Sequence, residues 1–339
     1  MKFVSIISFL FSCSLFSIAQ PVDTAGSEVI DFSKFTDAVA VKRYCNSKVN
    51  GQTPQRFISI GYEHQGAFSM PNMPNNFALN NTNYDVNSLT SFRATANIPV
   101  ISKDNIIWQM GANVNLSQIN SNTNANTPEY FNLINKSMNS VGINATIFKP
   151  LNEKHFIIFQ ASIDASEFNS SITNFNNKAL TTSASLIYGT KKNDDNMLGF
   201  GISRSYRAGR LMYFPVLFWN KNFNKKLGME LLLPAKGHVR YQPNQNNIYQ
   251  LGFELEGNQY YANINNRNVF VQRGELKPRL MLDKKLTTFF WLNVQAGLRY
   301  NWRFEGMNKF DGKDDANRIF KSNLTNPFYF NISLNFVSP

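Results

Sequence analysis

The stretch that decides the fold is Asn326-Pro-Phe-Tyr-Phe-Asn-Ile-Ser-Leu-Asn-Phe336, close to the C-terminus. Apolar residues occupy every second position from Phe328 to Phe336, with amide, hydroxyl or phenol groups between them. A period of two is that of a β-strand, whose successive side chains point to opposite faces of the sheet. A terminal strand of a soluble sandwich would alternate in the same way. The position favours another fold, because bacterial outer-membrane barrels usually end in an aromatic residue, and Phe336 lies three residues from the last residue.

Residues 1–19 have the features of a secretory signal peptide. Lys2 precedes an apolar run from Phe3 to Phe16, and the small residues Ser17 and Ala19 occupy the positions that a signal peptidase reads. The apolar run is too short for a helix that crosses a membrane. We therefore expect export and removal of this segment.

Residues 20–55 show little alternation, and we expect them to form a periplasmic lead-in that partly enters the mouth of the barrel. The barrel itself is expected to occupy residues 56–339. Once Cys13 is removed with the signal, Cys45 is the single cysteine of the mature chain. An intramolecular disulfide is then excluded, and with it a small disulfide-stapled fold. We expect Cys45 to be a free, inert thiol.

The composition suits a barrel with an apolar outside and a polar inside. The chain has 30 Phe and 13 Tyr, yet its mean hydropathy is only -0.30, because Asn is abundant. Beyond the signal, no stretch has the length of a transmembrane helix. The net charge of +12 could suggest nucleic acid. We reject that partner because an exported chain rarely meets nucleic acid and because many lysines cluster in the short links between strands.

Alternating blocks of about ten residues follow one another from residue 56 to residue 336, joined by long and short links in turn. The clearest block runs from Trp108 to Ser117. We expect long loops at 65–87, 119–138 and 167–178, and a further loop between Leu255 and Phe270. The pattern predicts an all-β fold, a closed antiparallel up-and-down transmembrane β-barrel of about 12–14 strands. The hairpin around Pro234 is short for two crossings, which leaves twelve strands open beside fourteen.

Charged residues within the blocks fall mostly on the face opposite the apolar one. One charge on the lipid face would cost roughly 2–4 kcal/mol at the membrane midplane. This segregation therefore favours lipid outside and a polar lumen inside. The expected lumen charges are Glu63, Arg93, Asp164, Glu230, Arg240, Glu254, Glu256, Arg273, Glu275, Lys277, Arg279 and Arg299.

Five segments resemble an uncharacterised family of outer-membrane β-barrel proteins from Bacteroidetes, which is classed as a domain of unknown function. They are Arg207–Pro215, Leu231–Lys236, His238–Tyr241, Leu255–Tyr261 and Asn301–Glu305. The likeness is best over about 180–305 and extends over 56–336. It implies the fold and a location in the bacterial outer membrane, but no activity, substrate or catalytic residue.

An enzyme is not expected. A lipid hydrolase would need a serine beside a histidine that a third polar group orients. Ser59 and Ser69 are the serines nearest to His64 in sequence, but their spacing selects neither, and His155 and His238 have no better partner. No metal-binding spacing, phosphate loop or nucleotide fingerprint is present, so no metal or cofactor is expected.

Two functions remain. The lumen charges either fill the bore as an ion-pair network or form a constriction that sets the selectivity of a porin-like solute channel. The alternative is a non-conducting structural barrel whose Asn-rich external loops bind an unidentified partner protein. Neutralising Arg279 and Arg299 should alter the ion preference of a channel.

The other expected partners are outer-membrane lipid and the barrel-assembly machinery. The machinery is expected to bind the apolar face of the C-terminal strand, formed by Phe328, Phe330, Ile332, Leu334 and Phe336.

Overall fold

The computed structural model describes residues 43–74, 83–121, 137–168, 170–171, 174–264 and 266–338. The chain divides into two units, Met1–Lys42 and Arg43–Pro339, and all described residues belong to the second. The expected signal peptide and residues 20–42 of the expected lead-in therefore lie outside the described residues.

The described part of the chain forms seventeen β-strands and two short 3-10 helices, Asn177–Ala179 and Asp315–Asn317. The strands are β1 (Arg56–Gln65), β2 (Phe68–Pro74), β3 (Asn83–Lys103), β4 (Ile106–Ser121), β5 (Met138–Pro150), β6 (His155–Phe168), β7 (Leu180–Asn193), β8 (Asn196–Ser205), β9 (Met212–Asn222), β10 (Leu227–Leu233), β11 (Lys236–Asn244), β12 (Asn247–Ile264), β13 (Arg267–Lys285), β14 (Phe290–Leu298), β15 (Tyr300–Met307), β16 (Arg318–Ser322) and β17 (Phe328–Val337). Among these residues no helix is long and apolar enough to cross a membrane.

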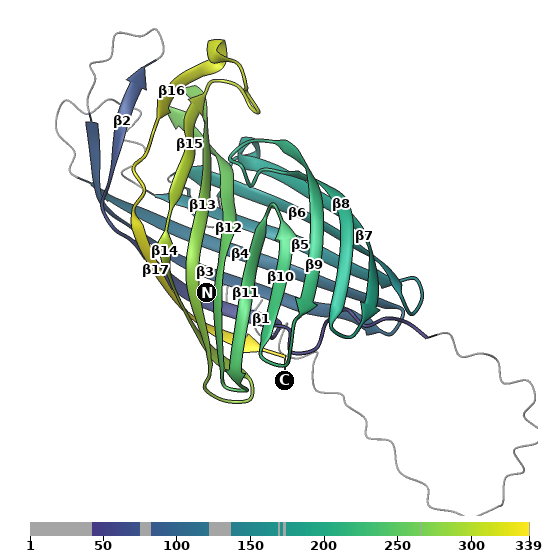
Figure 1. Ribbon diagram of the computed structural model, residues 1–339. Coiled ribbons are helices and arrows are strands. Elements are labelled where there is room, and N and C mark those ends of the chain that lie inside the picture. The colour runs from purple at the N-terminus through teal and green to yellow at the C-terminus, as the bar shows by residue number, and fades with distance from the viewer. Residues whose placement is uncertain are drawn as a thin grey trace, which may run out of the picture. The chain divides into compact units, whose positions relative to one another are not determined.

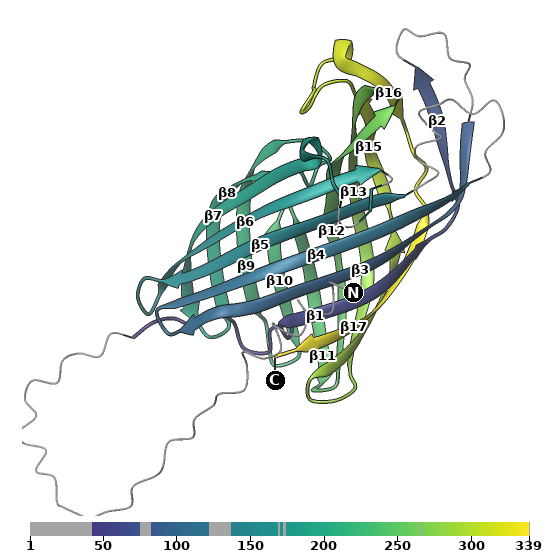
Figure 2. The ribbon, with the colours of Figure 1, turned by 180° about the vertical axis from the view of Figure 1, so that it is seen from behind.

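The strands close into a ring, which Figures 1 and 2 show from opposite sides. Most strands pair with their neighbours in sequence, and β17 closes the ring on β1 in antiparallel register, from Arg56 opposite Val337 to Gln65 opposite Tyr329. Three successive pairs, β1/β2, β14/β15 and β16/β17, each share one position of the ring. Both members of the first pair bond to β3 and both members of the second bond to β13, while β16 lies between β15 and β2 as β17 lies between β14 and β1. Fourteen positions result. The predicted all-β barrel is confirmed, and fourteen strands is the correct alternative.

The long connections lie at one end of the barrel, as expected, although the short β10–β11 and β12–β13 turns lie at that end as well. We call the end with the short turns and Val337 the turn end, and the other the loop end. The short turns join β3 to β4, β5 to β6, β7 to β8, β9 to β10, β11 to β12 and β13 to β14. Several turns are fixed by a side-chain amide that accepts backbone N–H groups, as Asn152 does for Lys154 and His155, both at 2.8 Å.

The outer face of the wall is apolar, and the inner face is polar over the middle of the barrel, because the strands alternate there. Contiguous exposed apolar patches larger than a few hundred Å² are rare on soluble monomers. Here exposed apolar side chains follow strand after strand around the ring. They include Ile58, Ile60 and Tyr62 of β1, Phe92 and Ile98 of β3, Leu186 and Tyr188 of β7, Phe200 and Ile202 of β8, Tyr249 and Leu251 of β12, Leu280 of β13, and Phe328, Phe330, Ile332 and Leu334 of β17.

The hairpin of β10 and β11 is shorter than its neighbours, which Figure 1 shows plainly. Pairing with β10 covers only the turn-end half of β9, up to Leu217, and pairing with β11 covers β12 only up to Glu254. Beyond the hairpin, residues 212–216 of β9 and 256–264 of β12 extend without a strand between them. Glu167 of β6 instead pairs in parallel with Tyr261 of β12, so the ring is narrower at the loop end.

Two expected loops contain strands instead. The predicted loop at 65–87 holds β2 and the first residues of β3, because Phe68, Met70, Tyr84 and Val86 form a buried core inside the loop end. The predicted loop after Leu255 is likewise wrong, since β12 and β13 continue as one long hairpin to Ile264 and Arg267.

Candidate functional site

The interior of the barrel has an apolar layer at each end and a charged layer between them. The layer at the loop end, which we call the loop-end core, consists of buried side chains from β2 to β6, from β12 and β13, from β15 and β16, and from the connection before β17. Its members are Phe68, Met70, Tyr84, Val86, Leu89, Ile119, Met138, Phe168, Tyr260, Ala262, Ile264, Val269, Val271, Phe304, Phe320 and Leu324. This core leaves little room for water between the described strands at the loop end.

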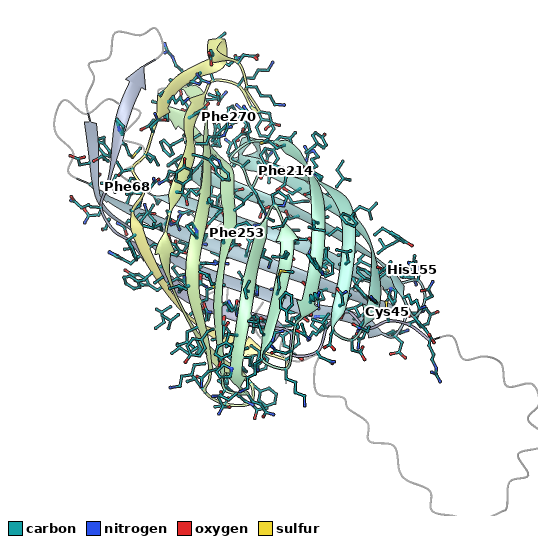
Figure 3. All side chains as sticks on the ribbon, viewed as in Figure 1. Cys45, Phe68, His155, Phe214, Phe253 and Phe270 are labelled. Atoms are coloured by element: carbon teal, nitrogen blue, oxygen red, sulfur yellow. The ribbon has the colours of Figure 1, made fainter. Side chains whose placement is uncertain are left out.

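The layer at the turn end, the turn-end cluster, combines inward residues of the strands with the segment that precedes β1. Cys45 and Val49 of that segment pack against Phe148, Phe156, Ile158, Ile187, Met197 and Val216. Figure 3 shows Cys45 beside His155 at this end, far from Phe68 of the loop-end core. Residues 43–55 thus lie across the turn end of the lumen.

Hydrogen bonds attach residues 43–55 to three successive turns. The Cys45 N–H donates to the Asn152 carbonyl at 3.1 Å, and the Asn50 N–H donates to the Asp194 carbonyl at 2.8 Å. The Asn222 side-chain amide donates to the carbonyl of Asn50. If residues 43–55 were displaced, the backbone groups of these turns would need other hydrogen-bond partners.

Two side chains of the barrel wall, Lys191 and Glu230, also hold residues 43–55. Lys191 donates to the Lys48 carbonyl at 2.9 Å and to the side-chain oxygen of Asn46. Glu230 accepts from the N–H and the hydroxyl of Thr53, both at 2.9 Å. Residues 43–55 are therefore bonded to the wall at both of their ends.

Cys45 is a free and buried thiol. Its Sγ lies 3.7 Å from the carbonyl oxygen of His155. Burial raises the pKa of the Cys45 thiol. Because the thiolate is the reactive form, the thiol is unreactive while residues 43–55 stay in place.

A network of ion pairs lies in the lumen between the turn-end cluster and the loop-end core. Glu63 is only 1% exposed, and it accepts from Lys277 Nζ at 2.8 Å, from Arg93 Nη2 at 3.2 Å and from Arg299. Glu256 accepts from the same Arg93 at 2.6 Å and the same Lys277 at 2.9 Å. Each buried charge thus has an opposite charge within hydrogen-bond distance, without which burial would cost several kcal/mol.

The network continues along β13 and below the cations. Glu275 accepts from Arg273 and from Arg299. The ring of Tyr329 lies beneath two cations, with its centroid 4.4 Å from Lys277 Nζ and 5.5 Å from the guanidinium carbon of Arg299. These cation–π contacts add to the ion pairs.

Two smaller ion clusters lie nearer the β10–β11 hairpin. Arg279 Nη2 lies 2.7 Å from one oxygen of Glu254, and Arg207 Nη1 lies 3.8 Å from the other. Glu230 pairs with Arg240, whose Nε lies 3.3 Å from it, and with His238 at 3.6 Å.

All twelve charges expected in the lumen lie on the inward face of their strands, and eleven take part in ion pairs. Asp164 is the exception: it accepts hydrogen bonds from Asn113 and Ser162 and has no cation beside it among the described residues. Sequence reasoning missed Arg207, Lys236, His238 and Tyr329. The alternation of β17 places Tyr329 inward and could have identified it. Arg207 lies in the connection between β8 and β9, where no alternation indicates the direction of a side chain.

A chamber of about 620 Å³ lies in this layer. One wall, from β3 to β8, presents short hydroxyl and amide side chains, and the opposite wall, from β11 to β13, presents charges. The first wall includes Ser91, Thr95, Asn97, Asn113, Asn115, Ser117, Ser140, Asn144, Thr146, Gln160, Ser162, Ser183, Ser185 and Ser203. The chamber can therefore hydrogen-bond a polar solute from all sides.

The sequence from residue 52 to residue 337 matches a family that is described as "Domain of unknown function (DUF6268)". The chain belongs to the DUF6268 family. This match covers the whole ring, from the residues just before β1 to the end of β17. No protein with a curated description matches the DUF6268 chain.

Several solved outer-membrane proteins are similar to the DUF6268 chain in strand arrangement. A FadL homologue of Pseudomonas aeruginosa has 8% identity and a TM-score of 0.44, with 84% of this chain and 90% of that one covered. The toluene transporter TodX of P. putida has 7% identity and a TM-score of 0.34, with 85% and 92% covered. The NanC porin has 7% identity and a TM-score of 0.34, with 82% and 100% covered. Because these TM-scores are low, the fold assignment rests on the strand pairing of the DUF6268 chain itself.

The histidines of the DUF6268 chain do not meet the serines considered for catalysis. Ser59 faces inward on β1, whereas His64, five residues later, faces outward and packs on the ring of Phe330 with centroids 5.4 Å apart. His155 bonds to the Tyr188 hydroxyl at 2.8 Å. Within the described ranges no three His, Cys, Asp or Glu side chains gather as a metal site would require.

Proposed function

We propose that this DUF6268 protein is a passive channel of the bacterial outer membrane for small hydrophilic solutes, with its turn end closed by residues 43–55. The observation that carries the proposal is the polar chamber of about 620 Å³ inside a ring whose outer face is apolar. A barrel that only anchors a protein needs no such chamber. Export through a signal peptide, an origin in Bacteroidetes and binding of the barrel-assembly machinery to the C-terminal strand remain predictions.

The faces of the wall support a place in a membrane. Backbone groups in hydrocarbon must be paired within the protein, and only helices and closed barrels achieve this. The ring closes between β1 and β17, and large apolar side chains such as Phe, Leu, Ile and Tyr are exposed around its outer face. The turn end would then face the periplasm, as it does in barrels with short periplasmic turns.

An external opening is supported beside the short hairpin. Arg207 lines the chamber, and its side chain is 52% exposed, so the chamber reaches the protein surface at the connection between β8 and β9. The loop-end core then need not open. Solute would enter beside this connection, and the turn-end cluster that residues 43–55 complete would be the remaining barrier.

Residues 43–55 are suited to a gate because separable contacts hold them. A typical hydrogen bond contributes only about 0.5–1.5 kcal/mol, so a short segment can leave while the ring stays folded. The barrel pairings do not depend on this segment, since β1 is bonded on both sides from Ile58 onward.

The test replaces the lysine that holds the segment. Lys191→Ala removes the donor to Asn46 and Lys48, and we expect more frequent opening in planar bilayers and at least severalfold faster labelling of Cys45 by a maleimide. Lys192→Ala is the matched control, because Lys192 is exposed on the same turn. If neither the parent chain nor Lys191→Ala ever gives conductance steps, the channel is rejected.

A second measurement concerns ion preference. Arg279→Gln removes the cation that lies 2.7 Å from Glu254, so the reversal potential in a KCl gradient should move toward cations. Arg267→Gln is the control, since Arg267 is exposed at the loop end. Arg299 is a poorer choice, because its removal would also leave Glu63 and Glu275 short of a partner. An unchanged reversal potential for Arg279→Gln would remove Glu254 and Arg279 from the conducting path.

One observation favours a non-conducting docking barrel as the second candidate. The loop-end core fills the lumen with apolar side chains, which a wide pore would not have. This candidate predicts no conductance and equally slow Cys45 labelling in both lysine variants.

A further inference from the structure

The charges around the chamber are not all matched. Nine charged residues line it among those the structure describes: Arg93, Asp164, Arg207, Lys236, Glu254, Glu256, Arg273, Glu275 and Arg299. Seven of them form ion pairs. The two that form no ion pair among the described residues are Lys236 and Asp164, which have opposite signs and lie on different walls.

Lys236 is the first residue of β11 and projects into the chamber from the tip of the short hairpin. Its side chain is exposed, and the residue across the ladder is Glu254. That carboxylate is already engaged by Arg279 and Arg207.

The other carboxylate near Lys236 is also occupied. Glu230 accepts both hydrogen bonds of Thr53 and pairs with Arg240. The described residues thus leave the ammonium group of Lys236 free to bind an anion in the chamber.

Asp164 lies on β6, in the wall of hydroxyl and amide groups. Its two oxygens accept from Asn113 Nδ2 at 3.3 Å and from Ser162 Oγ at 2.9 Å. The residue across the ladder is Gly142, where any side chain would overlap the carboxylate. The glycine therefore provides the space in which this anion lies, and neutral donors hold it there.

We infer that the chamber binds a small zwitterion, with Lys236 receiving its carboxylate and Asp164 its ammonium group. A ligand with one charge would satisfy one of these residues and leave the other to water. A zwitterion satisfies both, and charge-assisted hydrogen bonds are stronger in a partly dry site than in water. The chamber has the size of a small-molecule site, about 300–1,000 Å³. The inference rests on the proposed function, since it names the solute class that would pause in the channel.

The test measures binding to the full mature chain in detergent micelles by calorimetry, with glycine, 4-aminobutyrate and 6-aminohexanoate as probes. These zwitterions differ in the distance between their two charges. The one that binds most tightly therefore indicates the distance between the charged groups of Lys236 and Asp164. Butyrate and butylamine carry one charge each. We expect one zwitterion to bind roughly tenfold or more tightly than either of them.

Variants then assign the two ends. Lys236→Gln and Asp164→Asn should each weaken the preferred zwitterion roughly tenfold or more. Lys236→Gln should leave the affinity for butylamine unchanged, and Asp164→Asn should leave that for butyrate unchanged. Lys225→Gln and Asp104→Asn are the matched controls, since both residues are exposed in turns. Folding of each variant is checked by heat-modifiable gel mobility.

The inference is overturned if no zwitterion binds better than butyrate and butylamine, a result that requires no variant. It is also overturned if both variants bind like their controls. Binding without conductance would keep the site and reject the channel. Conductance without zwitterion binding would keep the channel and reject the site.

Discussion

Glu63→Ala should lower the free energy of unfolding by about 3–5 kcal/mol, the usual cost of removing one partner from a buried ion pair. Glu63 lies at the centre of the network and accepts from Arg93, Lys277 and Arg299. Removal of the Glu63 carboxylate leaves Lys277 and Arg299 buried in a network that has fewer carboxylates than cations. The measurement is a urea titration in micelles, with the folded fraction determined from heat-modifiable gel mobility.

Asp315→Ala is the control for Glu63→Ala. Asp315 also pairs with an arginine, Arg318 at 2.6 Å, but its side chain is 80% exposed. Exposed pairs contribute at most about 1 kcal/mol. If both variants changed the stability equally, the network around Glu63 would be open to water, and the lumen would not be the closed layer described above.

Leu251→Arg should destabilise the barrel by about 2–4 kcal/mol, as a cationic residue does at the midplane of a transmembrane barrel. Leu251 is 63% exposed and lies beside the equally exposed Leu280 of β13. In water, an exposed leucine tolerates arginine with a change of about 0.5 kcal/mol or less. The free energy of unfolding in lipid vesicles, obtained by denaturant titration, decides between lipid and water around this face.

Leu286→Arg provides the matched control. Leu286 is 52% exposed but lies in the turn between β13 and β14, beyond the membrane-spanning part. We expect a cost of roughly 0–1 kcal/mol there, as at the membrane interfaces. Equal effects at Leu251 and Leu286 would contradict the membrane assignment.

Alternation made the faces of the wall predictable from sequence. Phe328 to Phe336 follow a period of two, and the structure shows Phe328, Phe330, Ile332 and Leu334 exposed while Asn331, Ser333 and Asn335 are buried. The same alternation places the expected charges in the lumen without knowledge of which strands pair. Once one residue of a strand is known to face the lipid, the period of two fixes the face of every other residue in that strand.

The partners of those charges were not predictable, because they depend on closure of the ring. Lys277 and Glu63 are 214 residues apart in sequence. They meet because β17 pairs with β1 and β13 is separated from β17 only by β14. The role of residues 43–55 was also hidden, since Lys191 and Glu230 bind that segment mainly through groups that every sequence has, such as the Lys48 carbonyl and the Thr53 N–H.

The extension of β12 and β13 was missed for a different reason. Gln259 and Gln272 face outward beyond the expected lipid band, where the alternation rule expects apolar residues. The connection between β15 and β16 covers them: Gln259 accepts from the Asp311 N–H at 3.3 Å, and Gln272 donates to the Gly312 carbonyl at 2.8 Å. A wall covered by protein on its outer side does not need an apolar face there.

The short hairpin of β10 and β11 has a consequence for the depth at which the barrel is inserted in the bilayer. Above its tip, residues 212–216 of β9 and 256–260 of β12, up to the pairing of Tyr261 with β6, carry backbone N–H and C=O groups that pair with no strand on that side. Acyl chains cannot solvate such groups, and each one left bare there costs several kcal/mol. The hydrocarbon core of the bilayer must therefore end near Pro234. Hydrated sugar and phosphate headgroups then surround the gap between β9 and β12 above the hairpin. A depth-resolved quencher should accordingly reach a label at Leu231 from the acyl chains and a label at Tyr213 from the headgroups.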